Sequence, residues 1–172
     1  RGRTSAAGET VGRSVSATLG SRTGRYLVYA LVVLWTIPTF GLLVTRDAGA
    51  TWRWACESAI GFEGTYDPDF ELSASGALFA TTYRGLRVNR DGCVWAAPAG
   101  AVGSTPVSAL AVGTDGTLWA GTSDAVLGSA IYRSTDDGVT FTPTGLVGAD
   151  GDWWSTIEAA PGAPARLAVT AY

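Results

Sequence analysis

The stretch VTRDAGATW at residues 44–52 recurs twice further along the chain, and this recurrence decides the fold. The related stretches are VNRDGCVW at 88–95 and RSTDDGVTF at 133–141. Their central aspartates Asp47, Asp91 and Asp136 are separated by 44 residues (91 minus 47) and 45 residues (136 minus 91). Self-similarity at a fixed period of this size is typical of proteins that are built from repeated supersecondary units.

A second motif recurs with the first and has the pattern of a strand. It reads GALFATTY at 76–83, GTLWAGTS at 116–123 and ARLAVTAY at 165–172. Alternating apolar residues indicate a strand, and an Asp-Gly turn followed by an aromatic residue indicates a hairpin. The sequence therefore predicts an all-β chain. Over residues 34–172 we expect a partial β-propeller of about three four-stranded antiparallel blades, incomplete at its C-terminus.

The turn motifs resemble the Asp-box, or BNR, repeat of sialidase-like, photosystem-assembly-factor-like and sortilin-like propellers, whose pattern is Ser/Thr-x-Asp-x-Gly-x-Thr-Trp. The matching positions are Thr45, Asp47, Gly49, Thr51 and Trp52; Asn89, Asp91, Gly92 and Trp95; and Ser134, Asp136, Gly138, Thr140 and Phe141. The middle copy fits only if one residue is missing from its turn. The resemblance implies that each box closes the hairpin between the third and fourth strands of a blade, away from the central channel where ligands bind.

Physical reasoning gives the box residues a structural role. The aspartate is suited to accept backbone N–H bonds in a tight hairpin, and the glycine supplies a positive φ. The aromatic ring is expected to pack between neighbouring sheets. A calcium site built on Asp47, Asp91 and Asp136 is the alternative.

Charge divides the chain into two parts. Residues 1–45 hold five Arg and one acid, whereas residues 46–172 hold seven Arg and fourteen Asp and Glu. The acidic part argues against a nucleic-acid partner, which requires a basic face. A basic head before an apolar run is the pattern of an export signal or an amino-terminal anchor. We therefore expect residues 1–25 to be a flexible head and the protein to be extracellular, at the cell surface or periplasmic.

The uncharged run at 26–44 supports two interpretations. It approaches the length of a membrane span, and it resembles the first span of a sugar ABC transporter permease. However, aligning Asp47 with Asp91 also places Leu34 on Leu78 and Val44 on Val88 without a gap. This register predicts strands over 34–47 and leaves 26–33 as a short apolar segment. A helix over 26–40, with membrane association through it, is the alternative.

Three absent or rare residue types set further expectations. The chain has no His, which excludes imidazole metal sites and Ser-His or Cys-His pairs. It has no Met and carries fewer blades than the four to eight of a closed propeller, so we expect part of a larger or processed protein. Its two cysteines, Cys56 and Cys93, are predicted to be free, buried thiols.

Enzymatic activity is not the favoured interpretation. A sialidase requires an arginine triad, a Tyr–Glu pair, an Asp acid and an Arg-Ile-Pro motif. Here Ile37-Pro38 follows a threonine, and Arg84, Arg87 and Arg90 indicate a solvent-facing row. We expect a non-enzymatic binding or scaffolding module with no catalytic residue, no metal and no cofactor. The alternative is a fragment of a sialidase-like glycoside hydrolase whose catalytic residues lie in other blades.

Two loops are candidates for a ligand-binding rim opposite the box turns. They read GFEGTYDPDFE at 61–71 and GADGDWWST at 148–156. Acids beside aromatic residues suit a sugar or a cation, because rings stack on sugars and carboxylates accept hydroxyl bonds. The candidate rim residues are Tyr66, Asp67, Asp69, Asp152, Trp153 and Trp154, and the expected partner is a glycan or a protein. The alternative is that Trp153 and Trp154 begin the innermost strand of a blade and fill its core.

Overall fold

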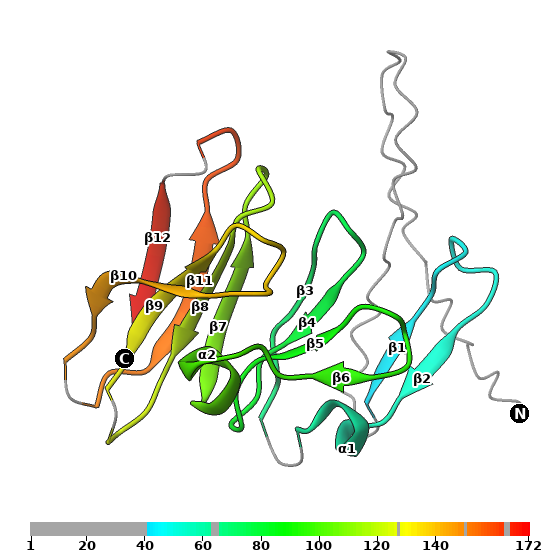
Figure 1. Ribbon diagram of the computed structural model, residues 1–172, viewed down its shortest axis with the longest axis horizontal. Helices are drawn as coiled ribbons and strands as arrows, with labels where there is room; N and C mark the ends of the chain where they lie inside the picture. Colours follow the sequence, from blue (N-terminus) through cyan, green and yellow to red (C-terminus); the bar gives the residue numbers. More distant parts are fainter. Residues whose placement is uncertain (1–40, 63–65, 127, 150, 164–165) are drawn as a thin grey trace, which may run out of the picture.

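The computed structural model describes residues 41–62, 66–126, 128–149, 151–163 and 166–172, and this part of the chain is all-β (Figure 1). The strands are β1 (Leu42–Val44), β2 (Arg53–Ala55), β3 (Phe70–Leu72), β4 (Leu78–Ala80), β5 (Arg87–Asn89), β6 (Trp95–Ala96), β7 (Val107–Val112), β8 (Leu118–Thr122), β9 (Ala130–Ser134), β10 (Thr142–Val147), β11 (Trp154–Ala159) and β12 (Leu167–Ala171). The expectations for the head at 1–25, the apolar segment at 26–33 and residues 34–40 lie outside this part.

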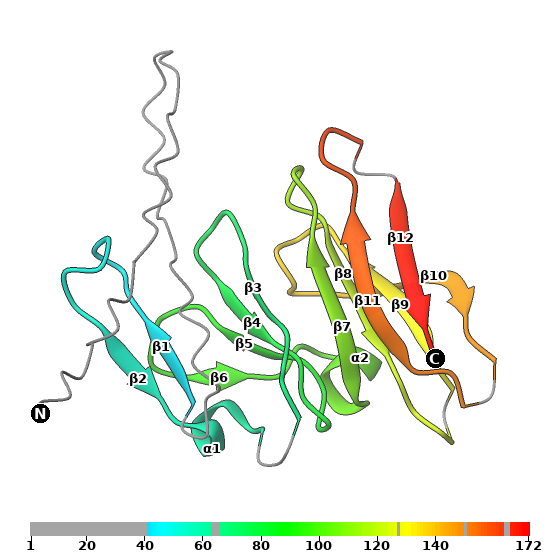
Figure 2. The same cartoon turned by 180° about the vertical axis from the view of Figure 1, so that it is seen from behind.

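The strands form four antiparallel sheets, and each sheet uses consecutive strands. Their orders are β1-β2, β3-β4-β5-β6, β7-β8-β9-β10 and β11-β12. We name them sheets A, B, C and D in chain order. Figures 1 and 2 show the sheets one after another along the molecule. The predicted all-β class and the four-stranded antiparallel unit are therefore confirmed.

The repeated sequence motifs occupy equivalent places in these sheets. The alternating segments at 76–83, 116–123 and 165–172 contain β4, β8 and β12, which are each the second strand of a sheet. The boxes lie in the β5–β6 and β9–β10 turns, between third and fourth strands, and in the β1–β2 turn. Leu42–Val44 is a strand, as the register against the second repeat predicts. Among the described residues, no helix combines the length and apolarity that crossing a bilayer requires.

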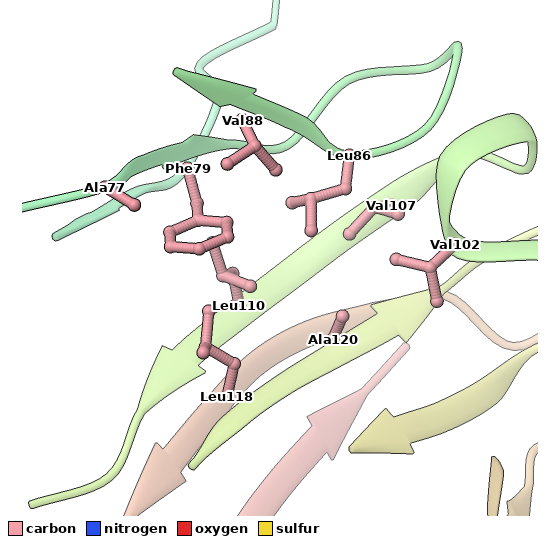
Figure 3. Close-up of a cluster of buried hydrophobic side chains, with 9 residues drawn as sticks. All are labelled: Ala77, Phe79, Leu86, Val88, Val102, Val107, Leu110, Leu118 and Ala120. Atoms are coloured by element: carbon pink, nitrogen blue, oxygen red, sulfur yellow. The ribbon is translucent and has the colours of Figure 1, made fainter. Parts of the chain in front are cut away.

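Sheets B and C pack face to face through a cluster of apolar side chains (Figure 3). Its members are Ala77, Phe79, Leu86, Val88, Val102, Val107, Leu110, Leu118 and Ala120. Phe79 of β4 is fully buried in this cluster, whereas its neighbours Leu78 and Ala80 point to the opposite face and pack toward sheet A. Because both faces of sheet B are covered, β4 has no polar side chain.

The same alternation continues on sheet C. Leu118 and Ala120 of β8 face sheet B. Trp119 points to the opposite face of sheet C, where it packs against Trp154 and Ile157 of β11 in sheet D. The cluster between sheets A and B contains Leu42, Ile60, Phe62, Leu78 and Ala80. Each sheet is thus stabilised chiefly by burial against its neighbours in the chain.

Polar contacts also connect successive sheets. Arg90, which follows β5, forms an ion pair of 2.7 Å with the carboxylate of Asp137 in the box turn of sheet C. The Arg90 guanidinium also donates to the backbone carbonyl oxygen of Asp137. Ser75 of the β3–β4 turn donates to the same carboxylate. At the previous junction the Arg46 guanidinium lies over Gly92, where an added Cβ would be 3.0 Å from the guanidinium carbon. An arginine at the second box position therefore contacts the box turn of the following sheet.

The prediction of a solvent-facing arginine row is wrong for Arg87, whereas Arg84 and Arg90 are exposed as predicted. Arg90 pairs with Asp137, and Arg87 is half-buried and donates to the carbonyl oxygens of Leu86, Arg84 and Gly103. Of the three, only Arg84 is exposed without such a contact from its guanidinium within the described residues. The reason is that a sheet edge facing another sheet offers carbonyl and carboxylate acceptors that the sequence of one strand does not reveal.

Two single-turn helices, which the sequence analysis did not predict, occupy the connections between sheets. The α1 helix (Glu57–Ile60) joins sheets A and B, and α2 (Ala101–Ser104) joins sheets B and C. The turn before β5 lies close against α2, since a Cβ on Gly85 would lie 2.3 Å from the Gly103 carbonyl carbon. The Leu86 N–H also donates to the Val102 carbonyl at 2.8 Å.

Candidate functional site

The third box is closed by side-chain hydrogen bonds. The Asp136 carboxylate accepts the Thr140 N–H at 2.9 Å, the Thr140 hydroxyl at 2.5 Å and the Ser134 hydroxyl at 2.7 Å. The Ser134 oxygen in turn accepts the Gly138 N–H at 2.9 Å. The hydrogen bonds from Thr140, followed by that from Ser134, lower the pKa of Asp136 to about 2. The ionised carboxylate therefore organises the turn.

In the first and middle boxes, an aspartate carboxylate also accepts the hydrogen bonds that close the turn, but the donor residues differ. Asp47 accepts the N–H and hydroxyl of Thr51, and Thr45 bonds both Asp47 and the Gly49 N–H. In the shortened middle turn, Asn89 accepts the Gly92 N–H at 2.7 Å. Asp91 there accepts the N–H groups of Cys93 and Val94 at 2.7 and 2.9 Å. Within the described residues, no group of three His, Cys, Asp or Glu is arranged to hold a metal ion.

The aromatic residues of the boxes differ in their environment. Phe141 packs against the cluster between sheets B and C, and Trp95 packs against the cluster between sheets A and B. The expectation of packing between two sheets is wrong for Trp52, which is 45% exposed. In the described part of the chain, sheet A has a neighbouring sheet on one side only, so this ring has no second sheet to contact.

The cysteines are free, as predicted, but they are not buried. Cys93 is exposed in the box turn, and Cys56 is half-buried at the start of α1 with its Sγ 3.3 Å from the Ser58 hydroxyl. For Cys93 the prediction of burial is wrong because the shortened middle turn is exposed, and for Cys56 it is wrong because the start of α1 leaves the side chain half-buried.

A cavity of about 650 Å³ lies at the end of the sheets opposite the box turns. This placement follows from the topology: the boxes follow the third strand of a sheet, whereas the first strand, which runs in the same direction, begins at the other end. The cavity is lined by Tyr66, Asp67, Asp69, Thr81, Tyr83, Val107, Ser108, Gly151, Trp153, Trp154, Ser155 and Tyr172. Its size is typical of small-molecule sites.

Five of the six candidate rim residues border this cavity. The exception is Asp152, whose carboxylate accepts the Ala149 N–H at 2.7 Å and so closes its own loop. Trp154 borders the cavity, but its side chain is only 6% exposed and packs on β8, where a Cβ on Gly121 would lie 3.2 Å from its Cβ. It thus fills the core, as the alternative interpretation expects. Trp153 is half-buried and contributes an accessible ring.

Three aromatic rings form a continuous surface in the cavity. The Tyr66 and Tyr83 ring centroids are 4.2 Å apart with the planes tilted by 58°, and the Tyr83 and Trp153 centroids are 5.8 Å apart in an edge contact. Tyr66 precedes β3, Tyr83 follows β4 and Trp153 precedes β11. The surface therefore joins sheet B to sheet D beside the beginning of β7.

Sequence reasoning missed Tyr83 and Tyr172 as cavity residues. Tyr83 is 50% exposed and lies between the other two rings. Tyr83 could have been found from its position at the end of the GALFATTY strand, because the loops that connect the strands converge at this end of the sheets. Tyr172 follows β12 in the same way and pairs with Trp153 through two backbone hydrogen bonds of 3.0 and 3.1 Å.

The polar residues around the cavity are held by the backbone. The Asp69 N–H donates to the Thr81 hydroxyl at 2.8 Å, and the Thr81 N–H donates to the Asp69 carbonyl at 3.0 Å. The Ser108 and Ser123 hydroxyls are 2.6 Å apart, and Ser123 accepts the Trp154 N–H. These bonds fix the beginning of β3 to the end of β4, and the beginnings of β7 and β11 to the end of β8.

Acids gather at one part of the cavity, around Asp69 and Glu71, whereas the charges of Arg84 and Arg87 act on Tyr66. Neighbouring protein atoms raise the pKa of Asp69 by partial desolvation, although the residue as a whole is exposed. Burial, followed by the charges of Asp69 and Glu158, raises the pKa of Glu71 on β3 to about 7. These three acids come from two sheets, and no basic residue appears among the described residues that line the cavity.

Replacing Glu71 with glutamine should change how stability depends on pH. The pKa of Glu71 rises from 4.5 to about 7 on folding. Between pH 4.5 and about 7, the folded state therefore keeps a proton on Glu71 that the unfolded state releases. The parent protein loses stability as the pH rises through this window. At about pH 8 the variant should be more stable by roughly 1–2 kcal/mol after solvent screening is allowed for. Chemical denaturation at two pH values measures this.

The comparison at about pH 5 serves as the internal control for Glu71→Gln. The Glu71 carboxyl is largely protonated there in the folded state and resembles the amide, so the two proteins should differ less than at high pH. An equal difference at both pH values would show that Glu71 does not titrate in this window.

No protein-family model, no curated protein and no solved structure matches the chain.

Proposed function

We propose that the chain is an Asp-box β-propeller module, exported from the cytoplasm, that binds a glycan in the rim cavity. The observation that carries the proposal is the aromatic surface of Tyr66, Tyr83 and Trp153, with the carboxylates of Asp67 and Asp69 beside it. Sugar rings stack on aromatic faces through their apolar C–H groups, and their hydroxyls donate to carboxylates.

The arrangement of the sheets supports the propeller part of the proposal. The first strands are neighbours, since β7 contacts both β3 and β11. The fourth strands β6 and β10, by contrast, lie well apart in Figures 1 and 2. Sheets that converge at their first strands and diverge at their fourth have the radial arrangement of propeller blades. The cavity then lies where the inner strands begin.

The chemistry of the cavity supports binding without catalysis of sialic acid cleavage. A sialidase grips the substrate carboxylate with arginines, whereas the described lining of this cavity has acids, hydroxyls and aromatic rings but no basic side chain. An anionic sugar would meet like charge at Asp67 and Asp69, which is unfavourable. The site therefore suits a ligand that is not an anion.

Tyr83→Ala and Trp153→Ala should each weaken glycan binding by at least about tenfold, because each removes a stacking ring at the centre of the cavity. Screening the full chain on a glycan array, followed by calorimetric titration of the glycans that bind, measures this. Folding should be little affected by Tyr83→Ala, since that side chain is 50% exposed.

Trp52→Ala is the matched control, because this partly exposed ring lies in the box turn of sheet A, at the opposite end of the sheets. It should bind like the parent. Equal losses in all three variants would indicate a general effect on folding, and a parent that binds no glycan would contradict the proposed function.

A further inference from the structure

The cavity has more carboxylates in and beside its lining than a neutral sugar requires. Asp67 and Asp69 line it, and Glu71 lies two residues further along, on the same face of β3 as Asp69 because side chains alternate along a strand. Glu158 of β11 adds a fourth acid close enough to raise the pKa of Glu71. Among the described residues, the lining and the charges that shift Asp69 and Glu71 include no cation, whereas the charges of Arg84 and Arg87 act on the neighbouring Tyr66.

The carboxylates of Asp67 and Asp69 are free to accept a ligand. No hydrogen bond from the described part of the chain reaches either carboxylate, although the backbone of Asp69 is fixed by its two bonds to Thr81. This contrasts with Asp136 and Asp152, whose carboxylates are used to close their own turns. Two unused acceptors, of which Asp69 has a fixed backbone, therefore lie beside an aromatic surface.

Resting on the proposed function, we propose that the cavity selects saccharides that carry a protonated amine over neutral and acidic ones. A pyranose that stacks on Tyr83 and Trp153 presents the substituents on its ring edge to the cavity wall. An ammonium group there would meet the carboxylates of Asp67 and Asp69 and the electron-rich faces of the rings.

Three disaccharides with one skeleton test the proposal. They are cellobiose, which is neutral; its 2,2′-diamino analogue, which is cationic when protonated; and cellobiouronic acid, which is anionic. Calorimetric titration of the full chain, at a pH below the pKa of the amines, should give a dissociation constant for the diamine about tenfold lower than for cellobiose. The acid should bind more weakly than both.

The double variant Asp67→Asn/Asp69→Asn should abolish this preference, because asparagine retains the shape and a hydrogen-bond acceptor but removes the charge. Asp115→Asn is the matched control. Asp115 lies in the β7–β8 turn, at the opposite end of β7 from the cavity, and should leave the preference unchanged. High salt should reduce the preference of the parent, since the attraction is electrostatic.

The outcomes separate this inference from the proposed function. A preference that is lost in the double variant and kept in Asp115→Asn supports both. Binding of cellobiose that equals or exceeds binding of the diamine overturns the inference and leaves the cavity as a neutral-glycan site. Tighter binding of the acid, or a preference that survives the double variant, overturns the inference as well. Failure of all three disaccharides and of the glycan array contradicts both proposals.

Discussion

Replacing Phe79 with alanine should lower the free energy of unfolding by about 3–5 kcal/mol. The Phe79 ring is fully buried between sheets B and C, where it contacts the apolar side chains of β7 and β8 (Figure 3). Its removal loses the transfer free energy of a whole ring and leaves a cavity that two rigid sheets close only in part. Urea unfolding followed by tryptophan fluorescence measures the loss.

Val94→Ala is a control in the same sheet. Val94 lies in the β5–β6 turn and is 63% exposed, so its truncation should cost less than about 0.5 kcal/mol. A loss for Phe79→Ala that is no larger than this would show that sheets B and C do not pack through β4.

Replacing Gly138 with alanine should cost about 2–4 kcal/mol, which is large for the addition of one methyl group. Gly138 has a φ of +74°, and a Cβ there would lie 2.4 Å from the Cε1 atom of Phe79. The substitution therefore adds backbone strain and forces the third box turn away from sheet B. Thermal and urea unfolding of the purified variant give the value.

Gly116→Ala separates the two contributions. Gly116 has a similar φ of +81° in the β7–β8 turn, but a Cβ there meets no atom within 4 Å. It should show the backbone penalty alone, about 1–2 kcal/mol. Equal losses at both glycines would mean that Gly138 does not contact the Phe79 ring, and a smaller Gly138→Ala loss in a Phe79→Leu background would demonstrate the contact directly.

The periodic features of this fold could be predicted from the sequence. Asp47 and Asp136 recur with the same neighbours, so their turns and the strands on either side follow from local chemistry. The cavity residues Tyr66, Asp67, Asp69 and Trp153 could be placed together because equivalent loops of successive repeats emerge at the same end. Both inferences require only the repeat register and the alternation of strands.

The remaining features depend on partners that local sequence does not identify. Trp153 and Trp154 are adjacent, and only the structure shows which ring is in the core. An irregularity in the pairing of β11 with β12, between Trp154 and Thr156, puts Trp154 and Ile157 on one face, against simple alternation. The Arg90–Asp137 pair likewise spans 47 residues and joins different sheets.

The arginine contacts between sheets have a consequence for how such a protein evolves by duplication. Arg90 and Asp137 belong to successive copies, so the contact is a property of the junction and not of either copy alone. A newly inserted copy preserves it only if it brings both an arginine for the next turn and a turn that receives the preceding arginine. The third box has Thr135 at the arginine position. The copies are therefore not interchangeable, and shuffling their order would break junctions even though every hairpin remained intact.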